Sequence, residues 1–252
     1  MRKWRTPSLT VGPLPLYCPK EGQKMKRACQ AIALVFVAAL IASSTFAQTT
    51  TTSRRARVTK VDGGDSENPY GGKLYVTING KRRRIHDHAY YAWSINDGRD
   101  VVFSSPYGSG GFENEGQALH LFNAGTGRTK KIMSEYVGVT ALQEVKLGNG
   151  KTALLVKMGD GGLGASYFAV VDPHRGEVFF RPRAELTRLQ GNTITLAFYN
   201  EDDWETINEA RAGKVDPPDQ VISHTQVKPF KTETHDLRKV LRGRVIYNKR
   251  YN

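Results

Sequence analysis

The feature that most restricts how this chain can fold is a repeated unit of short apolar segments separated by glycine-containing turns. One unit covers residues 96–127, and a second, looser unit covers residues 148–176. Each has a polar turn, an apolar segment, a glycine-rich stretch, another apolar segment and an Asx-x-x-x-Gly turn. The first turn of each unit contains a glycine, Gly98 and Gly150, and a third turn of the same kind contains Gly191. The separations between these glycines are 52 and 41 residues. Periods of this size, built from short strands, predict an all-β protein: a β-propeller-like stack of antiparallel meanders.

A β-hairpin is predicted just before the first unit. Two β-forming segments, Lys73–Ile78 and Lys81–His86, flank the dipeptide Asn79-Gly80. Asn-Gly readily adopts the positive φ angles that a two-residue type I′ turn requires. Further strands are expected at Val101–Ser104, Ala118–Phe122, Thr152–Lys157, Tyr167–Val171, Glu177–Phe180 and Thr193–Tyr199.

Helical patterns are few and short. They are confined to Asp203–Arg211 and Thr234–Leu241. We therefore expect a single β domain over residues 56–252, with a less regular C-terminal part from about residue 203.

The first unit carries a resemblance to a known family. Ala92–Ser105 reads AWSINDGRDVVFSS, and Leu119–Gly127 reads LHLFNAGTG. Together they resemble the repeat of bacterial TolB-type, WD40-like β-propellers, in which Trp-Ser-Pro-Asp-Gly precedes an apolar strand ending in Phe and Ser. The resemblance covers about 40 residues, and the chain departs from it by lacking proline after Ser94 and by one additional residue before Asp97-Gly98.

The resemblance implies a periplasmic interaction scaffold and implies no reaction. At the observed periods the chain is long enough for four or five blades, whereas a TolB-type ring has six. A small, open or incomplete propeller is therefore expected.

The N-terminal 47 residues have the pattern of a secretory signal peptide. Lys24, Lys26 and Arg27 precede the uncharged apolar run Ala31–Ala42, and small residues lead to Ala47. A run this short favours a cleaved signal over a membrane-spanning anchor, which needs roughly 20 apolar residues. We expect translation from Met1 or Met25, cleavage after Ala47, a flexible linker over residues 48–55, and a periplasmic or secreted protein without a membrane span after cleavage.

Cleavage would change the composition of the chain. The full chain has 252 residues and a formal net charge of +13. Residues 48–252 keep 205 residues and a charge of +7, and both cysteines, Cys18 and Cys29, are lost with the leader. The mature chain is then cysteine-free, which excludes disulfides, thiolate metal sites and a cysteine nucleophile.

The basic charge is concentrated near both ends of the mature chain. Net charge is +6 over residues 54–84, −5 over residues 85–227 and +6 over residues 228–252. The basic ends could form one positive face for a polyanion, or pair with the acidic middle, which we favour.

The run Lys81–Arg84 is the densest group of cations. Side chains on a strand alternate between its faces, so at most two of these cations serve one surface. Charge that protects an edge strand from aggregation is the favoured interpretation.

His86 and His88 are weak candidates for a metal site. Residues i and i+2 of a strand point to one face, so both imidazoles could bind one ion. The third ligand would have to come from another histidine (His120, His174, His224 or His235) or from an acidic side chain. We therefore predict neither a metal nor another cofactor.

Two further motifs match sites of known chemistry only formally. Gly159–Gly164 satisfies G-x-G-x-x-G, but a strand follows it instead of a helix, so a hairpin loop is predicted and no nucleotide is expected. Asp160 within it is one carboxylate, too few for a Ca²⁺ cage. Glu201–Glu205 is an acidic cluster containing Trp204, interpreted as a solvated loop and not as a glycosidase pair.

The sequence thus predicts an exported, non-catalytic binding or scaffold protein. The loops Ser104–Gln117 and Gly159–Ala165 occupy equivalent repeat positions and should emerge on one side. A protein partner is expected on this loop face, at Tyr107, Phe112 and Asp160. The alternatives are a secreted metal- or carboxylate-dependent hydrolase or lyase, and a polyanion-binding surface module.

Overall fold

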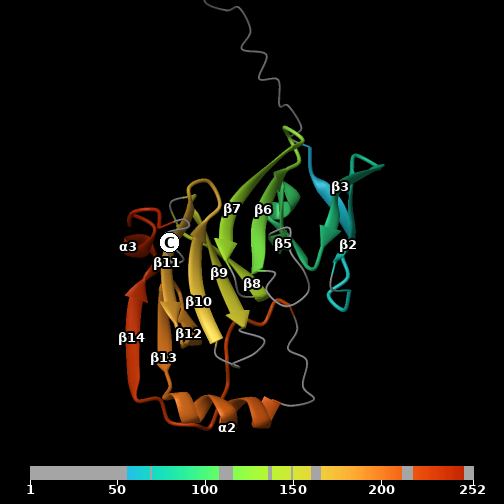
Figure 1. Ribbon diagram of the computed structural model, residues 1–252. Helices are drawn as coiled ribbons and strands as arrows, with labels where there is room; N and C mark the ends of the chain where they lie inside the picture. Colours follow the sequence, from blue (N-terminus) through green and yellow to red (C-terminus); the bar gives the residue numbers. More distant parts are fainter. Residues whose placement is uncertain are drawn as a thin grey trace, which may run out of the picture. The chain divides into compact units, whose positions relative to one another are not determined.

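A computed structural model describes residues 56–68, 70–107, 116–135, 138–148, 150–159, 166–211 and 218–246 (Figure 1). The predicted signal segment, the predicted linker over residues 48–55 and the tips of both predicted binding loops lie outside the described residues. Within the described ranges the chain is nearly all β-strand, arranged in four antiparallel sheets. No helix in these ranges is long and apolar enough to cross a membrane.

Each sheet is made of strands that are consecutive in the sequence. The first sheet contains β1 (Val58–Gly63), β2 (Gly72–Ile78) and β3 (Lys81–Ala89). The second contains β4 (Ala92–Ile95), β5 (Asp100–Tyr107), β6 (Gly116–Asn123) and β7 (Arg128–Glu135). The third contains β8 (Gly138–Lys146), β9 (Thr152–Gly159), β10 (Ser166–Asp172) and β11 (Gly176–Pro182). The fourth contains β12 (Ala184–Gln190), β13 (Thr193–Phe198) and β14 (Lys231–Asp236).

Three short helices complete the described structure. The 3-10 helix η1 (Asn96–Gly98) joins β4 to β5, α2 (Glu201–Arg211) follows β13, and α3 (Leu237–Val240) follows β14. The helix predicted over Asp203–Arg211 is confirmed. The helix predicted over Thr234–Leu241 is wrong in its first half, because Thr234 pairs with Thr195 of β13 and the helix begins only at Leu237.

The predicted hairpin is confirmed. Asn79 and Gly80 have φ angles of 51° and 77°, and Ile78 pairs with Lys81 directly across the turn. Five of the six further predicted strands lie within strands of the structure, and the sixth, Thr193–Tyr199, extends one residue beyond β13. Those missed by the sequence analysis include the mainly polar edge strand β7 and the four-residue strand β4, whose patterns carry too little apolar alternation.

The sequence repeat corresponds to equivalent strands of consecutive sheets. Residues 96–127 and 148–176 form the second and third strands of the second and third sheets, with the turns that flank them. The first-turn glycines have φ angles of 79° at Gly98, 74° at Gly150 and 57° at Gly191. A side chain is strained at such angles, so glycine recurs at this position.

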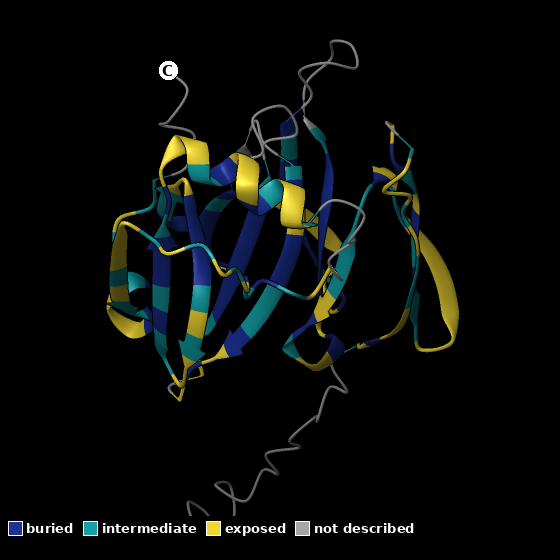
Figure 2. Cartoon of the chain, turned by 90° about the horizontal axis from the view of Figure 1, so that it is seen from below, coloured by how far each residue is buried: buried dark blue, intermediate teal, exposed yellow. Residues whose placement is uncertain are grey.

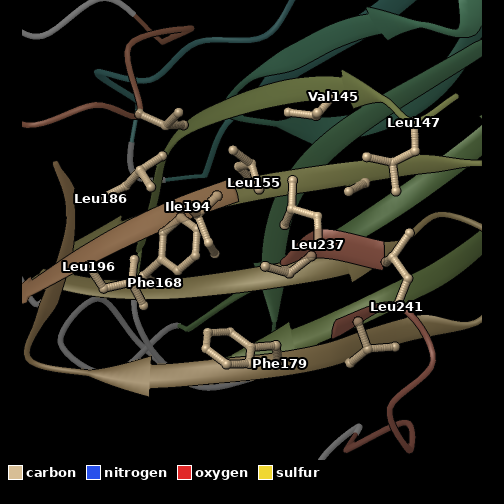
Figure 3. Packing of buried hydrophobic residues seen from close by; sticks show 14 of the residues in the cluster. Val145, Leu147, Leu155, Phe168, Phe179, Leu186, Ile194, Leu196, Leu237 and Leu241 are labelled. Carbon is tan, nitrogen blue, oxygen red and sulfur yellow. The ribbon is translucent and has the colours of Figure 1, made fainter. Parts of the chain in front are cut away.

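Three apolar clusters lie between neighbouring sheets. Along β5, Val101 and Phe103 pack towards the first sheet, while Val102 packs towards the third. The third sheet is likewise buried on both faces, and its side against the fourth sheet holds Leu155, Phe168 and Leu196 (Figure 3). Burial on both faces explains why β5 and β9 read as continuous apolar runs instead of alternating ones.

The stack of sheets is open. The main contacts between sheets join the first to the second, the second to the third and the third to the fourth. Among the described strands, none of the first sheet pairs with any of the fourth. The first sheet, at the right of Figure 2, is exposed along much of its outer side, whereas the strands of the middle sheets are mostly buried. The fold is therefore all-β and propeller-like, with consecutive meanders that do not close into a ring.

Candidate binding groove

Residues 218–223, which we call the inner strap, run along β4, β8 and β12. These are the first strands of the second, third and fourth sheets. The carbonyl oxygen of Pro218 accepts hydrogen bonds from the backbone nitrogen of Leu142 on β8, at 3.0 Å, and from Nε1 of Trp93 on β4, at 2.9 Å. At its other end, the backbone nitrogen of Ser223 donates to the carbonyl oxygen of Leu186 on β12, at 2.8 Å.

The strap binds where it does because β4, β8 and β12 are edge strands. Each is the first strand of its meander and has one side without a partner strand in its sheet. Backbone groups along such an edge need hydrogen-bond partners when they are buried. Pro218 and Ser223 supply two of these partners, and Ile222 adds a parallel bridge to Leu186.

A groove of about 380 Å³ lies between the edges of β4 and β8 and the strap. We call it the inner groove. Its lining residues are Trp93, Ser94 and Ile95 from β4, Leu142, Gln143 and Glu144 from β8, and Asp219, Gln220, Val221 and Ile222 from the strap. The volume falls within the range of ligand-binding clefts.

The lining of the inner groove is acidic and aromatic. It contains the carboxylates of Glu144 and Asp219, two side-chain amides and the indole of Trp93, and none of the lining residues that the structure describes is cationic. The Glu144 carboxylate is held by the backbone nitrogen of Asn96, which donates to Oε1 at 3.0 Å. The ring of Tyr91 lies 5.8 Å from that of Trp93 and extends the aromatic surface. Such a set of groups suits a cationic, hydrogen-bonding ligand.

A second cavity, of about 450 Å³, lies beside the fourth sheet. It is lined by Thr187, Tyr199, Ser223, His224, Thr225 and Gln226. Burial raises the pKa of the Tyr199 phenol to about 12, so the hydroxyl stays protonated. The Oγ of Ser223 is buried and has no hydrogen-bond partner among the described residues. This cavity is polar, but the Ser223 hydroxyl is closed off from solvent.

The predicted loop-face residues lie apart from the inner groove, so far as the structure describes them. Tyr107 ends β5, where it pairs with Gly116. Phe112 and Asp160 lie outside the described residues. The connection in the fourth sheet that corresponds to the two predicted loops runs from β13 to β14 and contains α2. The loop face therefore remains a prediction.

The two metal candidates on β3 differ in their surroundings. The half-buried ring of His86 lies 5.0 Å from that of Phe103 and 5.6 Å from that of His120, whereas His88 is exposed. The backbone nitrogen of His88 donates to Nδ1 of His86 at 3.1 Å, which occupies one possible ligand atom. Within the ranges that the structure describes, no three metal-ligating side chains come together.

Burial favours the neutral form of the His86 and His120 imidazoles. Desolvation lowers the pKa of His86, and with repulsion from His86 and Lys131 it lowers the pKa of His120 to about 4. Nε2 of His120 lies 2.9 Å from Oγ of Ser105, within hydrogen-bond distance. The cluster is a partly buried polar contact between the first two sheets.

The arginine run on β3 alternates as expected. Arg82 stacks over the ring of Tyr75 at 4.0 Å, and Arg84 pairs with Asp87 at 3.2 Å between Nε and Oδ1. Arg83 points to the other side, over the ring of Phe122. The two basic stretches, residues 54–84 and 228–252, do not form a joint face within the described residues, because their strands belong to the first and fourth sheets.

The remaining sequence motifs have structural roles. Glu201, Asp202 and Asp203 form the first turn of α2, so the predicted solvated loop is wrong there. Acidic side chains at this position complement the positive end of the helix dipole. Gly159 ends β9 and pairs with Ser166 of β10, which confirms an antiparallel hairpin connection for the glycine motif.

Sequence analysis missed the inner groove. Trp93 was noted only as part of the repeat segment Ala92–Ser105, and Glu144 and Asp219 carry no local motif. The available signal was the dipeptide Pro217-Pro218, which marks an extended, non-helical segment before Asp219. Nothing in that pattern indicates which strands the segment would cross.

Comparison with known proteins gives one structural likeness to report. The β-propeller domain of the Trilobed protease from Pyrococcus furiosus, described as having an open velcro topology, aligns with a TM-score of 0.37 and 12% sequence identity. The alignment covers 57% of this chain and 49% of that one, so it spans about half the length of the protease domain chain. No protein-family profile and no curated protein matches the chain.

Proposed function

We propose that this protein is an exported, non-catalytic binding protein whose inner groove holds a basic segment of a partner protein. The observation that carries the proposal is that two carboxylates, Glu144 and Asp219, and the indole of Trp93 line one groove, with no cation among its described lining residues. The groove is acidic although the chain as a whole is strongly basic. That contrast favours a cationic ligand over an anionic one.

The expected contacts follow from the groove's geometry. A lysine or arginine side chain can lie over the face of Trp93 while its head group donates hydrogen bonds to a carboxylate. Apart from the backbone nitrogen of Leu142, which the strap already binds, the edges of β4 and β8 offer backbone donors and acceptors to an extended peptide, as in strand-addition complexes. The groove would thus recognise its ligand both by charge and by backbone hydrogen bonds.

Binding is favoured over hydrolysis by the state of the groove's acidic groups. The Glu144 carboxylate already accepts a hydrogen bond from the backbone of Asn96, which holds it in a structural role. A general acid or base must instead lie within hydrogen-bond reach of the reacting proton of the substrate.

Two finer proposals accompany the binding function. We propose that the repeat is of the TolB type, supported by the position of Asp97-Gly98 at the turn between β4 and β5. We also propose export to the periplasm or cell exterior, supported by the basic and apolar pattern of residues 24–47.

Intrinsic fluorescence provides a direct test of the groove. Trp93 and Trp204 are the tryptophans outside the predicted signal segment, and Trp204 is buried elsewhere, on the inner face of α2. Titration with acetylated tetra-arginine amide should change the Trp93 emission, and tetra-glutamate should not. Asp219→Asn should weaken tetra-arginine binding about tenfold, as expected for the loss of one charge-assisted contact.

The matched control removes an equivalent carboxylate elsewhere. Asp202→Asn makes the same chemical change at an exposed position on α2. Equal affinities of the Asp219→Asn and Asp202→Asn variants for tetra-arginine would overturn the proposed groove, because the effect would then be one of overall charge.

A further inference from the structure

We propose that the outer strands of the first two sheets form a docking surface for an anionic phospholipid membrane. We call this surface the basic rim. It is an edge surface that combines exposed cations from both faces of β3, namely Lys81, Arg82, Arg83 and Arg84, with Arg128, Lys130 and Lys131 on β7. It goes beyond the proposed function, because it uses other strands and a ligand of the opposite charge.

The rim has a large excess of positive charge. All seven of its cationic residues are exposed. The carboxylates in the same two strands are Asp87, which pairs with Arg84, and Glu135 at the far end of β7. Clustered lysine and arginine side chains attract a surface of anionic head groups, with each added cation strengthening the attraction.

The two halves of the rim are in direct contact. Nη2 of Arg83 lies 3.4 Å from the carbonyl oxygen of Gly127, which accepts its hydrogen bond, and the guanidinium lies over the ring of Phe122. A Cβ at Gly127 would lie 2.6 Å from Nη1 of Arg83, so glycine allows this close approach. Arg128 follows directly, so β7 begins next to β3; two residues further, Nζ of Lys130 donates to the carbonyl oxygen of His174, between β10 and β11, at 2.8 Å.

Both strands lie at outer edges of their sheets. The strand order is β1-β2-β3 in the first sheet and β4-β5-β6-β7 in the second. The inner strap lies against the opposite edge of the second sheet, at β4. A partner in the inner groove and a membrane at the basic rim would therefore use opposite edges of the same sheet.

Phospholipid head groups fit the rim better than single-stranded nucleic acid does. Base stacking needs open aromatic faces, but the ring of Tyr75 on the adjacent strand β2 is covered by Arg82. The exposed large hydrophobic residues among the described ones are Tyr70 and Phe230, and neither belongs to the rim. The predicted export also places the chain beside lipid head groups. The interaction expected is electrostatic adsorption without insertion.

Vesicle co-sedimentation tests the basic rim with the full chain. The probes are vesicles of phosphatidylcholine alone and vesicles with 30% phosphatidylglycerol, at low and at high salt. Binding should require phosphatidylglycerol and should weaken as salt rises, since exposed charges are screened. Equal binding to the neutral vesicles would overturn the proposal, because the apolar residues 31–42 would then account for it.

Paired substitutions locate the binding surface. Lys81→Gln with Arg84→Gln, and Arg128→Gln with Lys131→Gln, should each lower the partition coefficient about tenfold. Arg188→Gln with Lys239→Gln removes two exposed cations from the fourth sheet and its following helix, and should leave binding almost unchanged. If all three pairs of substitutions lowered the partition coefficient equally, vesicle binding would depend on net charge alone, and the proposed basic rim would be overturned.

Two further outcomes also count against the proposal. If the rim variants aggregate while vesicle binding by their monomers is unchanged, the cations protect edge strands and do not bind lipid. If the protein binds a DNA duplex of random sequence more tightly than phosphatidylglycerol vesicles at the same salt concentration, the rim is a nucleic-acid surface instead.

Discussion

Trp93 and Pro218 are 125 residues apart in the sequence, yet the indole Nε1 of Trp93 donates a hydrogen bond to the Pro218 carbonyl oxygen over 2.9 Å. The same oxygen accepts from the backbone nitrogen of Leu142. One carbonyl group therefore holds the first strands of the second and third sheets to the inner strap. The inner groove depends on this contact.

Trp93→Phe should loosen the strap while keeping an aromatic ring on β4. Loss of the hydrogen bond should lower the free energy of unfolding by about 1 kcal/mol. Amide exchange at Leu142, measured by hydrogen–deuterium exchange, should become faster because its acceptor is less firmly held.

The matched control is Trp204→Phe. The buried Nε1 of Trp204 has no hydrogen-bond partner among the described residues. Its replacement should leave exchange at Leu142 unchanged. An unchanged exchange rate at Leu142 in Trp93→Phe would show that the indole hydrogen bond does not hold the strap.

Acid should destabilise the junction of the first two sheets through His120. Its folded-state pKa is about 4, below the ordinary value of about 6.5 for the unfolded chain. Between these values the unfolded chain binds more protons, so the stabilisation present above pH 6.5 is lost as pH falls to 4. The loss should be on the order of 2 kcal/mol, allowing for partial exposure of the ring.

The His120→Gln variant provides the comparison. Urea unfolding at pH 7 and at pH 4.5 should show a smaller pH-dependent difference for this variant than for the unmodified chain. His224→Gln, at an exposed position, should retain the full difference. Identical pH profiles for His120→Gln and the unmodified chain would rule out His120 as the source.

Arg211 should be essential for docking α2. Its guanidinium contacts both oxygens of the buried Glu185 carboxylate, with Nη1–Oε1 at 2.7 Å and Nη2–Oε2 at 2.9 Å. Arg211→Gln leaves that carboxylate without its cation, and it should lower the free energy of unfolding by about 3 kcal/mol. Thermal unfolding monitored by circular dichroism would measure the loss.

Arg183→Gln is the matched substitution for Arg211→Gln. Arg183 pairs with Glu201 at 3.4 Å, and both side chains are exposed. Such a pair should contribute less than about 1 kcal/mol. If both variants lost equal stability, the buried position of Glu185 would not be what makes the Arg211 contact strong.

Gly98→Ala should disturb the contact between the first two sheets. Gly98 has a φ of 79°, and a Cβ there would lie 2.6 Å from the carbonyl oxygen of Val58 on β1. Backbone strain of about 1–2 kcal/mol should therefore be joined by a steric clash. The midpoint of urea denaturation should fall clearly.

The Gly150→Ala variant measures the backbone strain without the steric clash. Gly150 has a similar φ of 74°, but nothing lies within 4 Å of a Cβ placed there. This variant should show the backbone strain alone. If Gly98→Ala lowered the denaturation midpoint no more than Gly150→Ala does, the backbone at Val58 would be able to move away without cost.

Much of the fold could be predicted because its signals are local. The turn at Asn79-Gly80 was predictable from two residues, since their permitted φ angles select a type I′ hairpin. The apolar runs of β5 and β9 were predictable for a similar reason, because burial on both faces favours unbroken apolar sequence. The helix predicted over Thr234–Leu241 failed in its first half, where pairing of β14 with β13 outweighs a weak helical pattern.

By itself, the sequence determined the all-β class, the repeat of meanders and the hairpin, because neighbouring residues encode turns and strands. Only the tertiary structure decided that Trp93, Glu144 and Asp219 line one groove, and that Arg83 reaches Gly127 to join two basic strands. These residues come from separate sheets and a distant strap. Their meeting depends on how buried faces stack and which edge backbone groups need partners, and neither follows from spacing along the chain.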